Sequence, residues 1–136
     1  MTTQALTAAS FEQIVLDNDI VLVDFWASWC GPCRTFGPIF EKASATHPDI
    51  VFGKVDTEAE QSLAAAAHIT SIPTLMAFRD GLLVFSQPGA LPAASLEQVI
   101  TGVRDLDMDD LRAETAEARK AGQQTADESQ AAGSAS

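Results

Sequence analysis

The chain has 136 residues, of which 46% are hydrophobic and 20% charged, and its formal net charge is −11. This length allows one domain with a short appendage, and the acidity argues against nucleic acid or an anionic membrane as main partner, since both are bound through clustered positive charge. The sequence begins without a basic, apolar leader, and its longest strongly apolar run, residues 20–23, is far shorter than a membrane span. We therefore expect a cytoplasmic protein, where a disulfide is more often catalytic or redox-sensing than structural.

The first elements predicted along the chain are a helix and a buried strand. Ser10 and Gln13 have the spacing of a capping box, which predicts a helix over residues 11–18. Residues 20–26, IVLVDFW, are apolar at every position except Asp24. A run that is apolar on both faces is typical of a central strand in a largely parallel sheet.

A second helix, a second strand and a third helix are predicted next. Helical sequence extends over residues 31–46, and DIVFGKVD, residues 49–56, is a second central strand. Thr57 and Glu60 form another capping-box pattern, which predicts a helix over residues 58–68. Helices and strands therefore alternate through the first half of the chain.

The last part of the domain predicts a hairpin and a helix. Residues 74–87 contain two apolar runs around Asp80-Gly81, a dipeptide typical of a tight β-turn. Residues 91–106 carry apolar side chains at helical spacing. An alternating first half followed by an antiparallel hairpin predicts a small α/β sandwich with a mixed sheet.

The sequence changes character after Leu106. We expect residues 1–106 to form one domain and residues 107–136 to form an acidic, low-complexity tail with seven acids and three bases. The tail as far as residue 122 can form a short exposed helix, and the rest has no large apolar residue, so we expect it to be disordered. An inert or weakly helical appendage is favoured over a docking segment or a helix packed on the domain, because few apolar side chains are present to be buried.

Cys30 and Cys33 are the only cysteines in the chain. A zinc site needs four ligands, but the two histidines, His47 and His68, stand at spacings that match no zinc pattern. A permanent staple is also disfavoured, because closing so small a loop removes little entropy from the unfolded chain. Two cysteines three positions apart at a strand-to-helix junction instead predict a redox-active disulfide.

The two cysteines are expected to have different roles. Cys30 lies at or just before the first helical turn, where unpaired N–H groups and the positive end of the helix dipole favour a thiolate. Cys33 lies one turn further along and should be more shielded. We therefore expect Cys30 to attack and Cys33 to resolve the mixed disulfide, while Gly31 removes bulk beside the reacting sulfur and Pro32 stiffens the loop.

Asp24 is the second unusual residue, because a carboxylate inside an apolar strand is costly to bury in its ionised form. Burial should raise its pKa, and Lys54 in the next strand is its candidate partner. The functional hypothesis makes Asp24 a proton acceptor and donor for Cys33, and the alternative is a solvated carboxylate at a strand edge. Trp26 is predicted to be core, and Trp29 is predicted to be exposed beside the cysteines.

Three segments, VDFWASWCGPC, SIPTLMAF and GAL, closely resemble the thioredoxin family, over a region from about residue 11 to residue 106. The resemblance implies the thioredoxin fold, an α/β fold with a central mixed β-sheet flanked by helices on both faces. It implies a thiol–disulfide oxidoreductase that reduces target proteins through a reversible Cys30–Cys33 dithiol/disulfide and a mixed-disulfide intermediate. It also implies a monomer without a bound cofactor, which receives electrons from NADPH through a thioredoxin reductase.

The resemblance also implies which residues meet a target protein. Pro73 should be in the cis form and face the disulfide, and the main chain at Ile72 should pair with an extended target segment. Asp24 and Lys54 match the family's buried pair. The implied target-binding surface consists of Trp29, Gly31, Pro32, Ile72, Pro73, Gly89 and Ala90.

Some positions depart from the common pattern of the family. Arg34 stands where lysine is frequent, Thr70 stands where arginine is frequent, and Ala67-His68 replaces a common Tyr-Gly. These departures alter the rim of the site near Ile72 and bear on the choice of target proteins.

Two other functions involve the same residues. An oxidant or isomerase is disfavoured by the Gly-Pro pair between the cysteines, by the acidic Asp24 and by the lack of a leader. A binding module would use the apolar surface around Trp29 and Pro73 without redox turnover, and a variant lacking both cysteines would then keep full function.

Overall fold

The computed structural model describes residues 3–114, which belong to two compact units that divide after Asp105. In the second unit, residues 108–114 are helical, as predicted for the start of the tail. The side chain of Asp107 accepts two main-chain N–H groups of the following turn at 3.1 and 3.2 Å, which caps this helix. The predictions for residues 115–136 lie outside the described residues.

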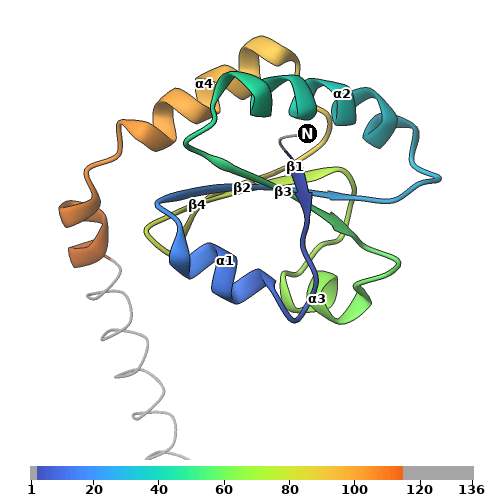
Figure 1. Cartoon of the computed structure of the whole chain (residues 1–136), viewed down its shortest axis with the longest axis horizontal. Coiled ribbons are helices and arrows are strands. Elements are labelled where there is room, and N and C mark those ends of the chain that lie inside the picture. The colour runs from blue at the N-terminus through green and yellow to red at the C-terminus, as the bar shows by residue number, and fades with distance from the viewer. Residues whose placement is uncertain (1–2, 115–136) are drawn as a thin grey trace, which may run out of the picture. The chain divides into compact units, whose positions relative to one another are not determined.

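The described part of the first unit contains five strands and four helices (Figure 1). In chain order they are β1 (Thr3–Ala5), α1 (Phe11–Asp17), β2 (Ile20–Trp26), α2 (Gly31–Thr46), β3 (Val51–Asp56), α3 (Gln61–Ala66), β4 (Thr74–Arg79), β5 (Leu82–Pro88) and α4 (Ala93–Arg104). The strands form one sheet in the order β1-β3-β2-β4-β5. Strands β1, β3 and β2 are parallel, whereas β4 is antiparallel to β2 and β5 is antiparallel to β4.

Helices cover both faces of this sheet. Figure 1 shows α2 and α4 on one face and α1 and α3 on the other. The predicted fold class, a central mixed sheet flanked by helices on both faces, is therefore confirmed. Within residues 3–114, no helix is both long enough and apolar enough to cross a membrane.

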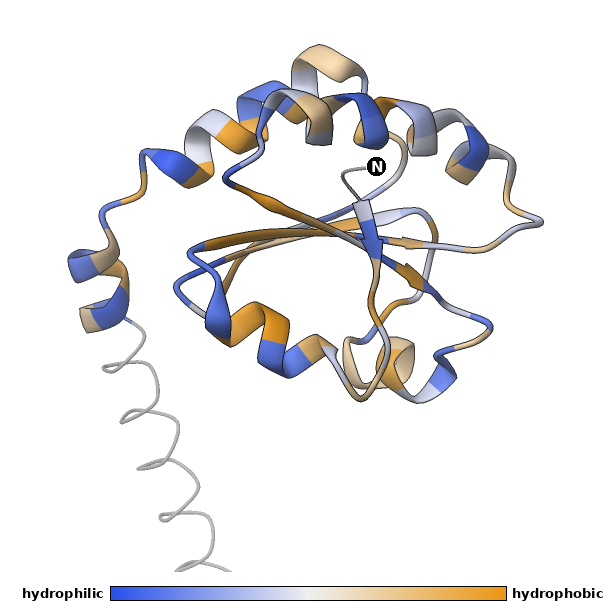
Figure 2. Ribbon diagram, viewed as in Figure 1, coloured by the Kyte–Doolittle hydropathy of each residue, from blue (hydrophilic) through white to orange (hydrophobic). Residues whose placement is uncertain are grey.

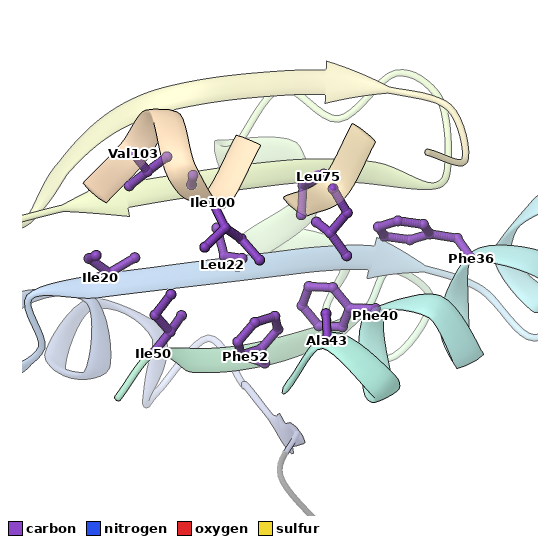
Figure 3. Packing of buried hydrophobic residues seen from close by; sticks show 12 residues of the cluster. Ile20, Leu22, Phe36, Phe40, Ala43, Ile50, Phe52, Leu75, Ile100 and Val103 are labelled. Atoms are coloured by element: carbon purple, nitrogen blue, oxygen red, sulfur yellow. The ribbon is translucent and has the colours of Figure 1, made fainter. Parts of the chain in front are cut away.

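The central strand β2 contributes side chains to two separate cores. Ile20 and Leu22 pack with buried residues of α2 and α4, whereas Val21, Val23 and Phe25 pack with a buried residue of α1. Figure 3 shows the first of these cores, and Figure 2 shows how hydrophobic the strands are along their length. Because both sides of β2 face the interior, its sequence is apolar at successive positions and does not alternate with polar residues.

Three aromatic rings hold α2 against the sheet. The ring centroids of Phe36 and Phe40 in α2 lie 5.8 Å apart, and the centroids of Phe40 and Phe52 in β3 lie 5.1 Å apart. All three side chains are fully buried. This packing fixes the position of α2, and therefore of the cysteines at its N-terminal end, relative to the strands.

The N-terminal region differs from the sequence prediction in two respects. Strand β1 is not predicted, because three residues of sequence TQA are too few and too polar to give a strand signal, and the pairing with β3 creates it. The predicted capping box at Ser10 and Gln13 is wrong. Ser10 precedes α1, but its hydroxyl accepts the N–H of Thr7 at 3.0 Å, so no side chain caps the helix.

The second predicted capping box, at Thr57 and Glu60, is also wrong. Helix α3 is shorter than predicted at both ends and begins after Glu60, whose side chain makes no capping bond. The Glu60 carboxylate instead accepts the N–H of Ala8 at 2.8 Å. The side chain of Asp56 accepts the N–H of Glu58 at 2.9 Å, so a turn occupies the place of the predicted first helical turn.

The predicted hairpin and final helix are confirmed. Strands β4 and β5 pair on either side of Asp80-Gly81, and both of these residues have positive φ, 52° and 82°. Such a turn suits the twist of an antiparallel pair and explains why aspartate and glycine occupy it. Helix α4 follows and packs Leu96, Ile100 and Val103 on the same core as α2.

Candidate functional site

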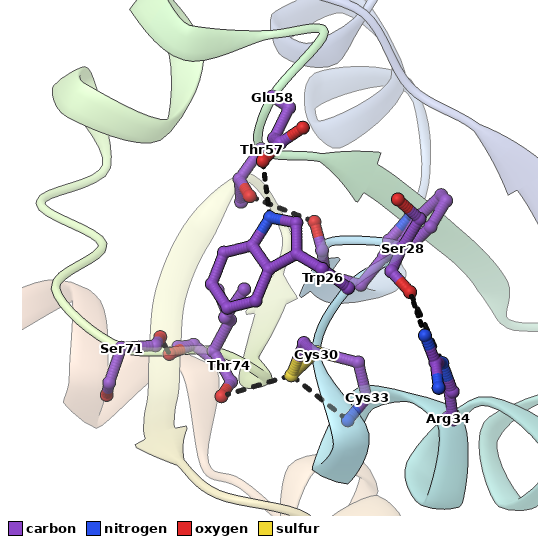
Figure 4. Close-up of a disulfide and its surroundings, with 11 residues drawn as sticks. Trp26, Ser28, Cys30, Cys33, Arg34, Thr57, Glu58, Ser71 and Thr74 are labelled. Atoms are coloured by element: carbon purple, nitrogen blue, oxygen red, sulfur yellow. Dashed lines mark hydrogen bonds between the residues drawn. A yellow bond between two sulfur atoms is a disulfide. The ribbon is translucent and has the colours of Figure 1, made fainter.

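The strand-to-helix junction after β2 places the two cysteines. Cys30 is the N-cap residue of α2, and Cys33 lies in the first turn of this helix. They form a disulfide with a Cα–Cα distance of 5.2 Å (Figure 4). The N–H of Cys30 donates to the carbonyl of Ala27 at 3.2 Å, which closes the loop between strand and helix. The prediction that these cysteines form a pair is confirmed.

The helix polarises Cys30 more than Cys33. The N–H of Cys33 donates to Cys30 Sγ at 3.2 Å, at the positive end of a 16-residue helix. A donor in this position stabilises negative charge on the sulfur that it faces.

The predicted difference in shielding between the cysteines is wrong. Cys30 is 4% exposed and Cys33 is 5% exposed, and both belong to a buried cluster with Ala27, against which the partly buried Trp26 and Ile72 pack. The two halves of the disulfide therefore differ in their hydrogen bonding and not in their exposure.

The Ile72-Pro73 segment lies against the disulfide. The Ile72–Pro73 peptide bond is cis, as predicted, and the carbonyl oxygen of Ile72 lies 3.6 Å from Cys30 Sγ. The carbonyl of Pro73 accepts the N–H of Gly89 at 2.7 Å. This bond joins the residue before β4 to the residue after β5. The structure thus brings Ile72 to the cysteines and joins Gly89 to the adjacent Pro73.

The remaining residues of the predicted target surface are exposed. Trp29 is 63% exposed, as predicted, and Gly31, Pro32 and Ala90 are also exposed. The indole N–H of Trp29 donates to the carboxylate of Glu58. No pattern in the sequence predicts a role for Glu58, since this contact joins two loops that are far apart in the chain.

Trp26 is not the core residue that the sequence predicts. It is only partly buried, beside the cysteines, and the ammonium of Lys54 lies 5.2 Å from its ring centroid. This distance is within the range of a cation–π interaction. Trp26 is the last residue of β2. The six residues before it in the strand are buried, and Trp26 is not.

Asp24 is fully buried on the α2 side of the sheet. It follows Leu22 on the same face of β2, and neither of its carboxyl oxygens has a hydrogen-bond partner. Burial raises the pKa of Asp24 from 3.8 to about 6, and the positive charge of Lys54 partly opposes this rise. The alternative of a solvated carboxylate at a strand edge is wrong.

Asp24 and Lys54 are neighbours without a direct ion pair. They are register partners in the parallel β2–β3 pair, as expected from the predicted adjacent strands. The carboxylate of Asp24 has no bonded partner, and the Lys54 ammonium lies over Trp26. The register decides that the two residues are adjacent, and the packing around Trp26 decides where the ammonium lies.

Of the residues that depart from the family pattern, Arg34 lies beside Cys33, whereas Ala67 and His68 line a separate pocket with residues of α1. Arg34 is exposed and donates from Nε and Nη2 to the carbonyl of Ser28, at 3.3 and 3.0 Å (Figure 4). His68 and Thr70 are exposed, and His68 has a positive φ of 57°. His68 stands where glycine is common in the family, and its backbone is in the left-handed region that glycine adopts most easily.

The histidines make no metal site in the described region. His47 interacts through Nε2 with Glu97 at 2.8 Å and through Nδ1 with Arg104 at 3.1 Å. Across residues 3–114, no three His, Cys, Asp or Glu side chains are grouped so that they could hold a metal ion.

Comparison with known proteins identifies relatives of this chain. The family model described as Thioredoxin matches residues 2–102. A "Putative thioredoxin 2" of Streptomyces coelicolor is 58% identical over 116 residues, which are 85% of this chain and 87% of the relative. "Thioredoxin 1" of Synechococcus elongatus is 45% identical over 71% of this chain and 92% of its own length.

Solved structures lead to the same family. A thioredoxin of Plasmodium falciparum is 36% identical with a TM-score of 0.69, and the match covers 74% of this chain and 98% of that one. A mutant thioredoxin of Halobacterium salinarum is 32% identical with a TM-score of 0.70, over 76% of this chain and 91% of that one. The protein therefore belongs to the thioredoxin family and is a thiol–disulfide oxidoreductase of the protein-disulfide-reducing type, with Cys30 and Cys33 as its redox-active pair.

Proposed function

We propose that Cys30 is the attacking residue and Cys33 the resolving residue in the reduction of target disulfides. The observation that carries this assignment is the hydrogen bond from the N–H of Cys33 to Cys30 Sγ, since a donor at a helix N-terminus stabilises a thiolate. The Cys30 thiolate attacks one sulfur of the target disulfide. A bond forms between Cys30 and that sulfur, the target S–S bond breaks, and the second target sulfur leaves as a thiolate.

Asp24 accepts the proton of Cys33 in the second step. Cys33 then attacks Cys30 Sγ, the Cys30–target bond breaks, and its electron pair leaves on the target sulfur. Two electrons pass in total from the protein dithiol to the target. Full burial, the lack of a bonded partner and a pKa of about 6 support this role, because a group that titrates near neutral pH can both accept and release the proton. Lys54 assists by limiting the rise of the Asp24 pKa.

The target meets the surface around the disulfide as an extended segment. Its main chain pairs with Ile72, and its side chains contact Trp29, Gly31, Pro32, Pro73, Gly89 and Ala90. The proximity of the Ile72 carbonyl to Cys30 Sγ supports this mode of binding, since a strand pairing there would place its own sulfur beside Cys30.

The reduced state is restored by NADPH through a thioredoxin reductase. The protein acts as a monomer in the cytoplasm, and residues 1–106 carry the activity without the tail. The family assignment supports these points, since thioredoxins work through their own cysteines and need no bound prosthetic group.

An NADPH-coupled assay tests the function directly. The full chain, a thioredoxin reductase and a disulfide-bonded protein substrate are mixed, and oxidation of NADPH is followed by absorbance. We expect turnover with the wild type and none above background with Cys30→Ser. Equal rates for the two proteins would contradict the proposed function.

Covalent trapping tests the separate roles of the cysteines. With Cys33→Ser, the mixed disulfide on Cys30 cannot be resolved, so target proteins should accumulate as covalent adducts that a reductant releases. Cys30→Ser is the matched control and should trap far fewer targets. Equal trapping by the two variants would contradict the roles assigned to Cys30 and Cys33. It would not contradict the overall function, which the NADPH-coupled assay tests separately.

A further inference from the structure

A cleft opens beside Cys33 on the α2 side of the disulfide. Its volume is about 450 Å³, and its lining includes Cys33, Trp26 and Gly37. In Figure 4, the disulfide lies between Arg34 and Ser28 on one side and the Ser71–Thr74 segment on the other. The cleft, which we call the α2 cleft, is therefore separate from the Ile72-Pro73 segment, although both adjoin the reacting sulfurs.

The first cation of the α2 cleft is Lys54. Its ammonium lies 5.2 Å from the Trp26 ring centroid, and a Cβ placed on Gly37 would lie 3.8 Å from it, so a glycine leaves space beside this charge. The neighbouring carboxylate of Asp24 has no bonded partner, and no carboxylate of residues 3–114 forms an ion pair with Lys54. This ammonium therefore keeps hydrogen-bonding capacity for a further acceptor.

The second cation is Arg34. Its Nε and Nη2 atoms both donate to the carbonyl of Ser28, which fixes the guanidinium plane against the loop before Cys30. A guanidinium has five N–H donors, so this contact leaves donors on the same side chain for another oxygen atom. The exposed position of Arg34 at the lining of the cleft makes these donors accessible to a docking protein.

The α2 cleft lacks the acidic excess of the rest of the molecule. Its lining carries two cations and one carboxylate, Glu41, whose Oε2 accepts the hydroxyl of Thr3 at 2.8 Å. Asp24, the neighbour of Lys54, adds one negative charge when it is ionised. Residues 1–106 as a whole carry twelve acids and five bases. A carboxylate on a partner would therefore be repelled by most of this surface and attracted at the α2 cleft, beside the disulfide.

We propose that the α2 cleft is a specificity site that binds a side-chain carboxylate of the target protein, on an aspartate or glutamate near the cysteine under attack. The inference rests on the proposed function, since it concerns the disulfide-bearing targets of the same site. A target strand that pairs with Ile72 rises by about 3.3 Å per residue, so the acidic residue lies within about three residues of the target cysteine. Arg34 and Lys54 supply the donors, and Glu41 weakens the attraction.

A pair of disulfide peptides that differ only by Glu or Gln beside one cysteine tests this proposal. The full chain is first reduced chemically, and the second-order rate constant of peptide reduction is measured in a single turnover without any reductase. The readout is the ratio of the Glu-peptide rate constant to the Gln-peptide rate constant. This ratio cancels any effect of a variant on the cysteine chemistry that is common to the two peptides.

For the wild type at low salt we expect a ratio of about two to five, the effect of one partly exposed ion pair, and a lower ratio at about 0.5 M salt. Arg34→Gln should lower the ratio, Arg34→Lys should lower it less, and Glu41→Gln should raise it. Lys42→Gln is the matched control, because it removes one positive charge from α2 outside the cleft and should leave the ratio unchanged.

Two results would overturn the proposal. One is a wild-type ratio of one with both peptides reduced, which leaves the proposed function intact and removes only the carboxylate site. The other is a ratio that Arg34→Gln and Lys42→Gln lower equally, which would assign the preference to the overall charge of the protein. If neither peptide is reduced, the proposed function itself fails.

Discussion

Replacing Asp24 by asparagine should stabilise the protein near neutral pH. The carboxylate is fully buried without a bonded partner, and its pKa is raised from 3.8 to about 6. The folded protein therefore binds this proton more tightly than the unfolded chain does. The contribution of Asp24 to stability is full below its unfolded pKa and is lost as the pH rises through about 6.

The size of the effect follows from the change in pKa. At 1.36 kcal/mol for each pKa unit, a rise from 3.8 to about 6 corresponds to about 3 kcal/mol between the fully protonated and fully ionised protein. Asparagine has nearly the shape of the protonated side chain and cannot ionise. Asp24→Asn should thus raise the free energy of unfolding by about 3 kcal/mol at about pH 8, and by roughly 0.5 kcal/mol at about pH 4.

Urea unfolding of the oxidised full chain between about pH 4 and pH 8 measures this difference, with Asp19→Asn as the control for loss of a carboxylate that is not fully buried. The gain in stability should come with slower release of targets from Cys30, because Asp24 is the proton acceptor proposed for Cys33. Two results would contradict this prediction. One is an Asp24→Asn protein that is less stable than the wild type, and the other is a gain in the free energy of unfolding that does not shrink toward acid pH.

Three further substitutions test the packing and the backbone of the fold. Gly53→Ala places a Cβ 2.7 Å from Cγ of the buried Leu6, so we expect a loss of about 1–3 kcal/mol by urea unfolding. Phe40→Ala removes a fully buried ring from the contact between α2 and the sheet, and it should cost about 3–5 kcal/mol in the same measurement. Gly89→Ala puts a side chain at φ 100° where the N–H bonds to the Pro73 carbonyl, and we expect a loss of about 1–2 kcal/mol and slower peptide reduction. A thermal or urea midpoint equal to that of the wild type would contradict each of these expectations.

Much of the fold is predictable because its signals are local. The apolar run of β2, the Asp80-Gly81 turn and the apolar spacing of α4 each lie within a single segment, and the structure confirms all three. The capping boxes at Ser10 and Thr57 fail because their side chains bind other main-chain N–H groups. Ser10 accepts the nearby N–H of Thr7, whereas Glu60 accepts the N–H of Ala8, a contact that is made only after distant segments meet.

The sequence by itself determines the chemistry of the site. Cys30 and Cys33 stand three positions apart at the start of a helix, so their pairing and the field on Cys30 follow from local geometry. An aspartate inside a strand that is apolar on both faces is expected to be buried, and the structure decides for burial over a solvated strand edge.

Only the tertiary structure decides how the site is surrounded. The carbonyl of Ile72 reaches Cys30, Lys54 turns to Trp26 without bonding Asp24, and both cysteines are equally covered. Each of these facts depends on the register between strands or on the packing of segments far apart in the chain. A pattern in one segment cannot predict such contacts, because they stabilise the protein only after the fold has brought both segments together.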